Sequence, residues 1–196
     1  MRIVLVRHGQ TEWSASGKHT STTDLPLTEA GRRAAAALPL RNREFALILT
    51  SPRLRARETC ELAGFSGEVD GDLAEFDYGE YEGLTTKEIR EQREWWSLWR
   101  DGCPGGETAA LVGARVDRVI ARALWAGGDV ALFAHGHVLR VLGARWLGLP
   151  ASSGVDGRRR SGQAGCCHRP ARRTGSRYGR AFPRARCAAR RGSGGP

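Results

Sequence analysis

The chain has 196 residues, a formal net charge of +10 and five cysteines. Its length suits one α/β domain with a full hydrophobic core and is too short for two domains of ordinary size. The cysteines are odd in number and form no C-x-x-C pair, which argues against a zinc site and a disulfide framework. Charges at Arg2 and Arg7 interrupt the apolar N-terminus, so we expect no signal peptide, no membrane partner and a cytoplasmic location.

The positive charge belongs to the C-terminal segment. Residues 155–196 contain twelve Arg, no Lys and one acidic residue, so they carry +11 and leave −1 on residues 1–154. We therefore expect a folded domain over residues 1–154 and an Arg/Gly-rich, non-core tail over residues 155–196. The tail lacks the aromatic interleaving of a nucleic-acid-binding arm, so nucleic acid is not an expected partner.

Two origins of the tail fit its composition. A glycine-rich segment without Leu, Ile or Met is typical of a disordered tail. Enrichment in Arg, Gly, Ala, Pro and Cys, with Lys absent, is also what a shifted reading frame of GC-rich coding sequence produces. We favour the second origin, and resequencing the 3′ end of the coding region tests it.

The predicted elements begin with a buried strand over residues 3–6 that ends on reactive side chains. Arg7 and His8 follow this strand directly. Gly9 lets the backbone approach a ligand, and Thr11 adds a hydroxyl donor. Because ligands of open parallel α/β sheets bind at the carboxyl ends of strands, this end predicts an anion site with a candidate nucleophile.

A polar loop over residues 14–26 follows and is placed to line the mouth of the site. Thr28 is the predicted N-cap of a helix that Pro39 ends, and a second strand follows over residues 45–50. The next helix is expected to begin at Pro52.

This helix carries three arginines at the same sheet edge. Arg53 and Arg57 share one helix face, whereas Arg55 points about 160° away from both. Periodicity does not decide which face looks into the site.

A glycine-punctuated loop that mixes acids with aromatics follows a short strand over residues 68–73. Its acids are Glu75, Asp77, Glu80 and Glu82, and its aromatics are Phe76, Tyr78 and Tyr81. Desolvation beside buried rings raises the pKa of a carboxyl, so one acid of this loop is a candidate proton donor.

Thr85 and Glu88 form a predicted capping box for a helix that carries a tryptophan cluster, which we expect to pack as core or lid. The cluster consists of Trp95, Trp96 and Trp99. A turn-rich hinge over residues 102–108 then precedes an amphipathic helix over residues 111–124.

The next strand, residues 130–134, ends in His135-Gly136-His137, and a helix continues to residue 147. A single His-Gly pair is weak evidence, because short patterns recur by chance. Two strands that both end in His-Gly predict that His8 and His135 meet at one sheet edge.

Such a set of groups suits phosphoryl transfer. An imidazole is a competent nucleophile toward phosphorus, and the resulting phosphohistidine is hydrolysed in a second step. Two arginines and a second histidine balance the charge on the phosphoryl oxygens without a metal ion or another cofactor. A carboxylic acid supplies the proton that the leaving oxygen needs.

Over residues 2–150 the chain resembles the histidine phosphatase superfamily, the phosphoglycerate-mutase-like proteins. The resemblance implies a three-layer α/β/α fold with a mostly parallel central sheet. The family's Arg-His-Gly signature matches Arg7-His8-Gly9, which implies that His8 accepts the phosphoryl group beside Arg7. The family's second arginine, four residues after the serine that closes the second strand, corresponds to Arg55.

The resemblance also assigns the acid and the second histidine. The family's acid/base glutamate corresponds to Glu75, and its second histidine corresponds to His135, with the Gly136 amide nearby. Further assignments on the phosphate and substrate side fall on Thr11, Ser14, His19, Arg140 and the three tryptophans.

Within the superfamily, the chain is more similar to sugar-phosphate phosphatases of the sedoheptulose-bisphosphatase kind and to bacterial acid phosphatases than to mutases. Mutases usually have Asn where this chain has Ser14, and they carry a longer insertion after the glutamate loop. In this chain the stretch after the glutamate loop is short, so water can reach the phosphohistidine, and hydrolysis is expected to prevail. The motifs that carry this similarity are residues 7–14, 77–83, 99–103 and 134–137, with 24–28.

The tail departs from the family pattern. Members continue with a strand that returns to the sheet, and residues 155–196 are not expected to provide one. We therefore expect the C-terminal edge strand to be missing, with an unpaired sheet edge and lower stability.

The sequence favours a metal-independent phosphomonoesterase that uses a phosphorylated His8. Its expected partner is a small phosphorylated metabolite, a sugar phosphate or bisphosphate, and a homo-oligomer remains open. Two alternatives also remain open, a phosphoglycerate mutase and a phosphatase-fold binding protein without turnover. Phosphate release from a sugar bisphosphate separates hydrolysis from mutase activity.

Overall fold

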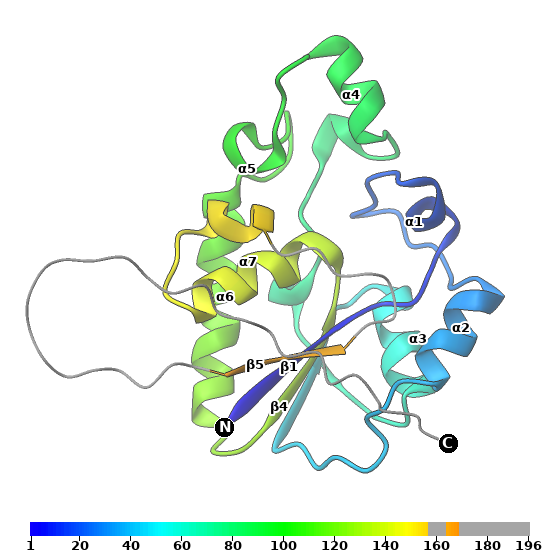
Figure 1. Ribbon diagram of the computed structural model, residues 1–196, viewed down its shortest axis with the longest axis vertical. Coiled ribbons are helices and arrows are strands. Elements are labelled where there is room, and N and C mark those ends of the chain that lie inside the picture. Colours follow the sequence, from blue (N-terminus) through cyan, green and yellow to red (C-terminus); the bar gives the residue numbers. More distant parts are fainter. Residues whose placement is uncertain (157–163, 169–196) are drawn as a thin grey trace, which may run out of the picture.

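The protein is described by a computed structural model, which covers residues 1–156 and 164–168 (Figure 1). The strands are β1 (Arg2–Arg7), β2 (Leu47–Thr50), β3 (Glu68–Val69), β4 (Val130–Ala134) and β5 (Ala164–His168). The α-helices are α1 (Glu12–Ser16), α2 (Glu29–Ala36), α3 (Leu54–Leu62), α4 (Thr86–Gln92), α5 (Leu98–Asp101), α6 (Ala109–Trp125) and α7 (Gly136–Trp146). Three 3₁₀ turns complete these elements, η1 (Gly71–Leu73), η2 (Gly79–Tyr81) and η3 (Ala151–Asp156).

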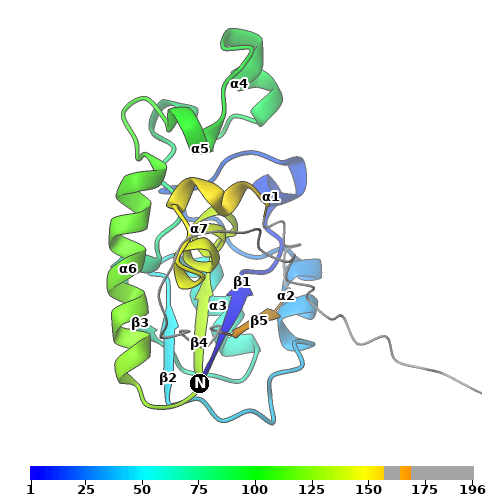
Figure 2. The ribbon, with the colours of Figure 1, turned by 60° about the vertical axis from the view of Figure 1, so that its left-hand side comes forward.

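The strands form one sheet in the order β3-β2-β4-β1-β5. Strands β1 to β4 pair in parallel, and β1 lies beside β4 with Arg7 opposite Ala134. The two central strands therefore end level with each other. Their carboxyl ends point toward the side of the molecule that carries α1 and the protruding α4 (Figures 1 and 2).

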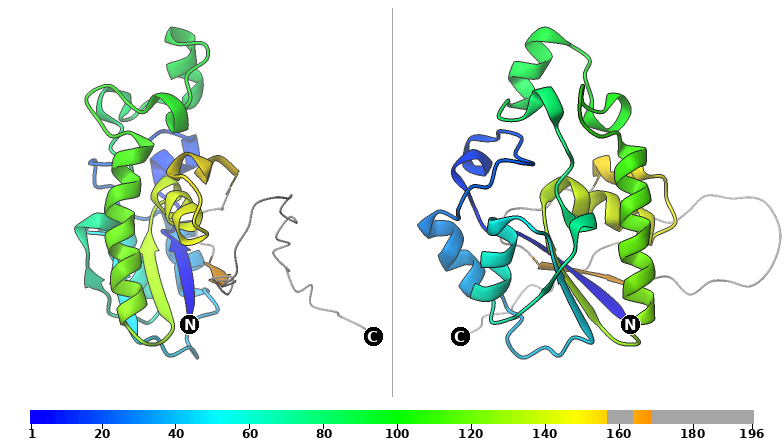
Figure 3. Two further views of the ribbon diagram at one scale, coloured as in Figure 1. Left: turned by 90° about the vertical axis from the view of Figure 1, so that its left-hand side faces the viewer. Right: turned by 180° about the vertical axis from the view of Figure 1, so that it is seen from behind.

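Helices cover both faces of the sheet because successive strand side chains point to opposite sides. On β1, Ile3 and Leu5 belong to the larger core with α6 and α7. Val4 and Val6 belong to the smaller core with residues next to α2 and in α3. The two helix layers lie on opposite sides of the strands in Figure 3. This arrangement confirms the predicted three-layer α/β/α class.

Threonine caps begin several helices. The Thr28 hydroxyl accepts a hydrogen bond from the Gly31 amide, and α2 begins at the next residue, as predicted. Thr85 and Glu88 form the predicted capping box of α4. Thr108 caps α6, which covers the whole segment expected to be amphipathic, residues 111–124, and extends beyond it at both ends. These caps were predictable because each satisfies a backbone amide three residues away.

Several other boundaries differ from the prediction. Helix α3 begins at Leu54 rather than at Pro52. Helix α1 overlaps the start of the polar loop expected over residues 14–26, because Thr11 and Ser14 cap each other's backbone amides. The strand expected over residues 68–73 is shorter, because β3 ends at Val69 and η1 follows.

The predicted tryptophan-bearing helix is divided into α4 and α5. The chain turns between them, and the indole N–H of Trp96 donates to the Gly102 carbonyl at 2.8 Å. Trp96 is therefore drawn into the core, whereas Trp95 is left 77% exposed. A tertiary contact of this kind overrides helical periodicity.

The expectation of a missing C-terminal edge strand is wrong. Strand β5 pairs antiparallel with β1, from Arg2 opposite His168 to Val6 opposite Ala164. Edge pairing uses backbone N–H and C=O groups, which every residue except proline supplies. A segment poor in large apolar side chains can therefore close this edge.

Residues 157–163 and 169–196 lie outside the described part of the chain, and so does the expectation of a disordered or frame-shifted tail there. Among the residues that are described, no helix combines the length and apolar composition needed to cross a membrane.

The backbone at Gly31 packs so closely against residues 9 and 10 that a side chain at this position should destabilise the fold. A Cβ atom added at Gly31 would lie 2.3 Å from the Gln10 carbonyl oxygen, whereas one added at Gly143 meets nothing within 4 Å. Alanine in a helix normally stabilises by about 1 kcal/mol relative to glycine. We expect Gly143→Ala to show this gain in urea unfolding and Gly31→Ala to lose about 1–3 kcal/mol. Equal effects of both substitutions would contradict the close approach.

Candidate active site

The two predicted histidines meet because β1 and β4 end in register. The His8 amide donates to the Ala134 carbonyl at 2.9 Å, which continues the ladder one residue past β1. The imidazole centroids of His8 and His135 are 5.1 Å apart. The prediction that both rings lie at one sheet edge is confirmed.

His8 is held in one neutral tautomer. Its Nδ1 lies 2.7 Å from the Gly9 carbonyl oxygen, which can only accept, so Nδ1 carries the hydrogen. Burial, and then the positive charges of Arg55 and Arg7, lower the pKa of His8 to about 3. At neutral pH, His8 therefore keeps an unprotonated Nε2, which is the form a nucleophile requires.

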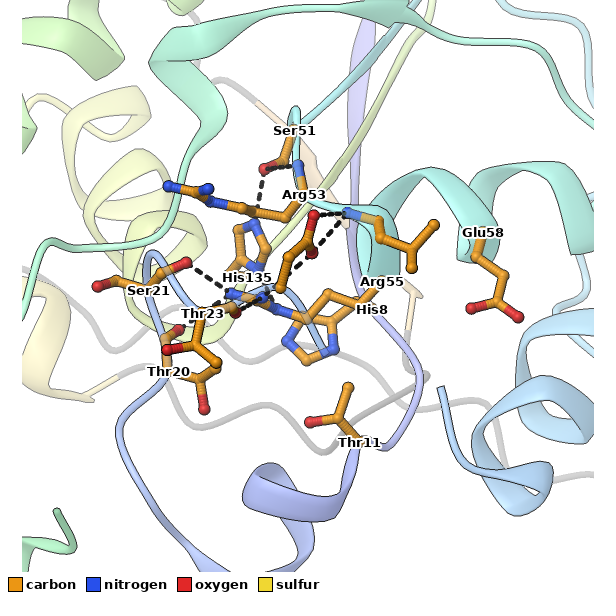
Figure 4. Close-up of polar contacts among 12 residues, drawn as sticks. His8, Thr11, Thr20, Ser21, Thr23, Ser51, Arg53, Arg55, Glu58 and His135 are labelled. Carbon is orange, nitrogen blue, oxygen red and sulfur yellow. Dashed lines mark hydrogen bonds and ion pairs between the residues drawn. The ribbon is translucent and has the colours of Figure 1, made fainter. Parts of the chain in front are cut away.

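Of the three arginines, Arg55 is the one turned inward beside His135, although it is not among the residues that line the pocket described below. Its side chain is fully buried, whereas Arg57 is exposed and Arg53 is half-buried. The Arg55 guanidinium donates to the carbonyls of Thr20, Ser21 and Thr23 at 2.9 to 3.2 Å, as the dashed lines of Figure 4 show. This resolves the choice that helix periodicity left open. Arg55 fixes the loop that passes over the site.

His135 lies behind His8 and is neutral. The Arg55 Nε donates to Nδ1 of His135 at 3.2 Å, so the ring hydrogen is on Nε2, which lies 2.7 Å from the Ser51 hydroxyl. Burial, and then the neighbouring His8 and Arg55, hold the pKa of His135 well below its usual range. His135 is fully buried and is not among the residues that line the pocket, so its expected part in balancing phosphoryl charge stays a prediction.

Glu75 is held at the site by the first turn of α7. One carboxylate oxygen accepts from the Val138 amide at 2.9 Å, and the other accepts from the His137 amide at 3.1 Å. These amides belong to the first turn of α7, where unpaired N–H groups favour a carboxylate. Of the four acids in the loop, Glu75 alone lines the pocket described below.

Another acid of this loop has a structural role. Both oxygens of Glu82 accept from the Ser21 amide, and one also accepts from the Thr23 amide. Burial raises the pKa of Glu82, but a hydrogen bond from the Ser21 hydroxyl, together with those from the two amides, outweighs burial and lowers the pKa overall. Glu82 therefore holds the same loop that Arg55 binds.

These groups open onto a pocket of about 770 Å³. Its wall contains most of the residues that the sequence assigned to phosphate and substrate, namely Arg7, His8, Ser14, His19, Glu75, Gly136 and Arg140. Lys18, Tyr78 and His137 also line it, although they were not among the residues predicted from the sequence. Within the described residues, no three His, Cys, Asp or Glu side chains are grouped to hold a metal ion.

Thr11 lies outside the pocket wall. Its hydroxyl accepts from the Ser14 amide at 3.2 Å, which commits it to capping α1. Two of the three tryptophans line a neighbouring cavity. Trp96 and Trp99 line a smaller cavity of about 230 Å³ that shares His19, His137 and Arg140 with the main pocket, and Trp95 lines neither.

One missed pair had a signal in the sequence. The Tyr78 hydroxyl lies 2.6 Å from Nδ1 of His137, the second histidine of the His-Gly-His triplet. Burial raises the pKa of Tyr78 and lowers that of His137, so Tyr78 donates to a neutral ring. A repeated histidine two residues beyond a site residue indicated a further polar group at this sheet edge.

Comparison with known proteins assigns the family. The profile of the histidine phosphatase superfamily (branch 1) matches residues 3–165. The chain belongs to the histidine phosphatase superfamily. An acid phosphatase of Mycobacterium tuberculosis is 44% identical over 160 residues, covering 78% of this chain and 79% of the relative. Sedoheptulose 1,7-bisphosphatase of Saccharomyces cerevisiae is 42% identical over 185 residues, covering 76% of this chain and 68% of the relative.

A solved structure agrees with this assignment. The protein of open reading frame Rv3214 from Mycobacterium tuberculosis superposes with a TM-score of 0.82 at 40% identity, covering 87% of this chain and 92% of that one. With phosphatases among its similar relatives, this histidine phosphatase superfamily member is an enzyme of the phosphatase type.

The neutral histidines make the stability of this phosphatase sensitive to acid. Burial lowers the pKa of His19 to about 4, against about 6.5 in an unfolded chain. Between these values the unfolded state binds a proton that the folded state does not, so stability falls as pH falls below about 6.5. We expect each such histidine to cost about 2 kcal/mol between pH 6.5 and pH 5.

Urea unfolding at several pH values checks this expectation. His19→Gln removes one titrating ring. It should therefore reduce the loss of stability between pH 6.5 and pH 5 by about 2 kcal/mol, the contribution expected of one histidine. A variant that keeps the full pH dependence of the native chain would show that His19 is not buried in its neutral form.

Proposed function

We propose that the protein hydrolyses monoesters of small phosphorylated sugars through a phosphohistidine at His8. The observation that carries this proposal is the fixed tautomer of His8, which leaves its Nε2 unprotonated beside Arg7 in the pocket. A neutral imidazole next to a guanidinium combines a nucleophile with a cation for the phosphoryl oxygens.

In the first step, Nε2 of His8 forms a bond to phosphorus while the ester P–O bond breaks. Arg7 lines the pocket beside His8 and offsets charge on the phosphoryl oxygens. Glu75, when protonated, gives its proton to the leaving oxygen. The alcohol then departs and the phosphoryl group stays on His8.

In the second step, water attacks phosphorus and the N–P bond breaks. The carboxylate of Glu75 takes the proton that the water loses, and the amides of His137 and Val138 stabilise it in the charged form. Inorganic phosphate leaves and His8 returns to its neutral form.

The walls of the pocket favour a substrate with a second anionic group. Lys18 and Arg140 line it together with Arg7, and its volume of about 770 Å³ exceeds what one phosphate fills. The similarity to a sedoheptulose 1,7-bisphosphatase also supports a sugar bisphosphate. We propose the cytoplasm as the place of action, because such highly charged metabolites do not cross membranes unaided.

Phosphate release from a panel of sugar phosphates, with chelator present, tests the mechanism. Activity should survive the chelator and fall at least about a thousandfold in His8→Ala, because the nucleophile is gone. Mass spectrometry of alkaline-quenched samples should find the phosphoryl group on His8 of the native chain. Full inhibition by chelator, or turnover by His8→Ala, would refute the proposal. Interconversion of phosphoglycerates without phosphate release would support the mutase instead.

The two lysines of the chain test the second anionic group. Lys18 lines the pocket, whereas Lys87 lies outside it. We expect Lys18→Gln to raise the KM of a sugar bisphosphate by about threefold to tenfold and to leave the KM of the monophosphate unchanged. Lys87→Gln serves as the control and should change neither. An equal rise for both substrates would argue against a second anion site at Lys18.

A further inference from the structure

Arg115 of α6 holds the backbone that carries Glu75. One of its terminal nitrogens donates to the carbonyls of Asp72 and Ala74 at 2.6 and 2.8 Å, and the other donates to the Glu75 carbonyl at 3.1 Å. Its remaining bonds go to both oxygens of Glu107 at 2.9 Å. All five N–H groups of this guanidinium are therefore used, and the side chain is 11% exposed.

Glu107 extends the clamp past Glu75. Its carboxylate accepts from the Asp77 amide, and its own amide donates to the Asp77 carbonyl, both at 2.9 Å. The segment that carries the acid is thus bound on both sides of residue 75. Residues 74–78, between η1 and η2, belong to no helix or strand, so the Arg115–Glu107 pair supplies partners for the carbonyls of Ala74, Glu75 and Asp77.

The clamp and α7 hold Glu75 from two directions. Its backbone carbonyl is fixed to α6 through Arg115, and its carboxylate is fixed to the first amides of α7. A general acid must stay within hydrogen-bond reach of the oxygen it protonates, and a displacement of about 1 Å can cost a hundredfold in rate. The two anchors together set where the carboxyl group meets the pocket.

We propose that Arg115 is a positioning residue for proton donation by Glu75, a role that rests on the proposed function of Glu75 as the acid. Arg118 offers a matched comparison one turn along α6. It binds the same loop through the Asp72 side chain, touches no backbone carbonyl of the segment, and is 64% exposed. A lysine in place of Arg115 keeps the positive charge but cannot reproduce the planar fork.

A pair of aryl phosphates separates positioning of the acid from general loss of structure. Phenyl phosphate and p-nitrophenyl phosphate share their shape at the reacting end, but the nitro group stabilises the leaving phenolate, so that substrate needs little help from an acid. The measured quantity is kcat/KM, which reports the steps up to formation of the phosphohistidine. The proteins are the native chain and the variants Glu75→Gln, Arg115→Lys, Glu107→Gln and Arg118→Lys.

We expect Glu75→Gln and Arg115→Lys to lower kcat/KM for phenyl phosphate about tenfold to a hundredfold more than for p-nitrophenyl phosphate. Arg118→Lys should leave the ratio of the two constants unchanged. Glu107→Gln weakens the clamp without removing the guanidinium, so it should shift the ratio in the same direction. If Arg115→Lys fails to fold, the ratio measured for Glu107→Gln tests the positioning role in its place.

The outcomes separate the two assignments. If Glu75→Gln changes the ratio but the clamp variants lower both constants equally, or not at all, Arg115 is only structural and the positioning role is overturned. If Glu75→Gln itself leaves the ratio unchanged, Glu75 is not the acid, and the positioning role is overturned with it. The assignment of His8 as the phosphorylated residue would stand under either result.

Discussion

The parallel register of β1 and β4 is the constraint on which the site depends. With Arg7 opposite Ala134, the next residue of each strand is a histidine, and the ladder brings the two rings within 5.1 Å. A shift of one residue would separate them and turn every core side chain of β1 to the other face. The packing of Ile3 and Leu5 against α6 and α7 therefore also fixes the positions of His8 and His135 relative to each other.

Burial then decides the protonation of the groups that the register brings together. Desolvation is the largest influence that lowers the pKa of His8, and the nearby arginines act in the same direction. The site thus gathers several cations and keeps its imidazoles neutral. This combination suits a nucleophile that must meet an anion, because a protonated ring would have no lone pair to offer. As a consequence, the free energy of unfolding falls at acid pH.

Features that depend on neighbouring residues in the sequence could be predicted, whereas features that depend on tertiary contacts could not. The strands before His8 and His135 and the cap at Thr85 depend on neighbouring residues, so local patterns located them. The break before Trp96 depends on a carbonyl six residues away, and β5 depends on the free edge of β1. Neither partner is visible in the local pattern of either segment. The complete burial of His135 likewise depends on tertiary contacts with Arg55 and Ser51.

The arginines around the site show how a cationic side chain can serve as internal scaffold. Arg55 and Arg115 both direct their donors to backbone carbonyls of loops, and Arg7 lines the pocket. Loops that carry reactive groups lack the ladder bonds of regular structure, and a planar guanidinium can bind several such carbonyls at once. A lysine offers a point charge without this geometry. The chain therefore uses buried arginine to give its loops the rigidity that strands and helices obtain from their own backbone.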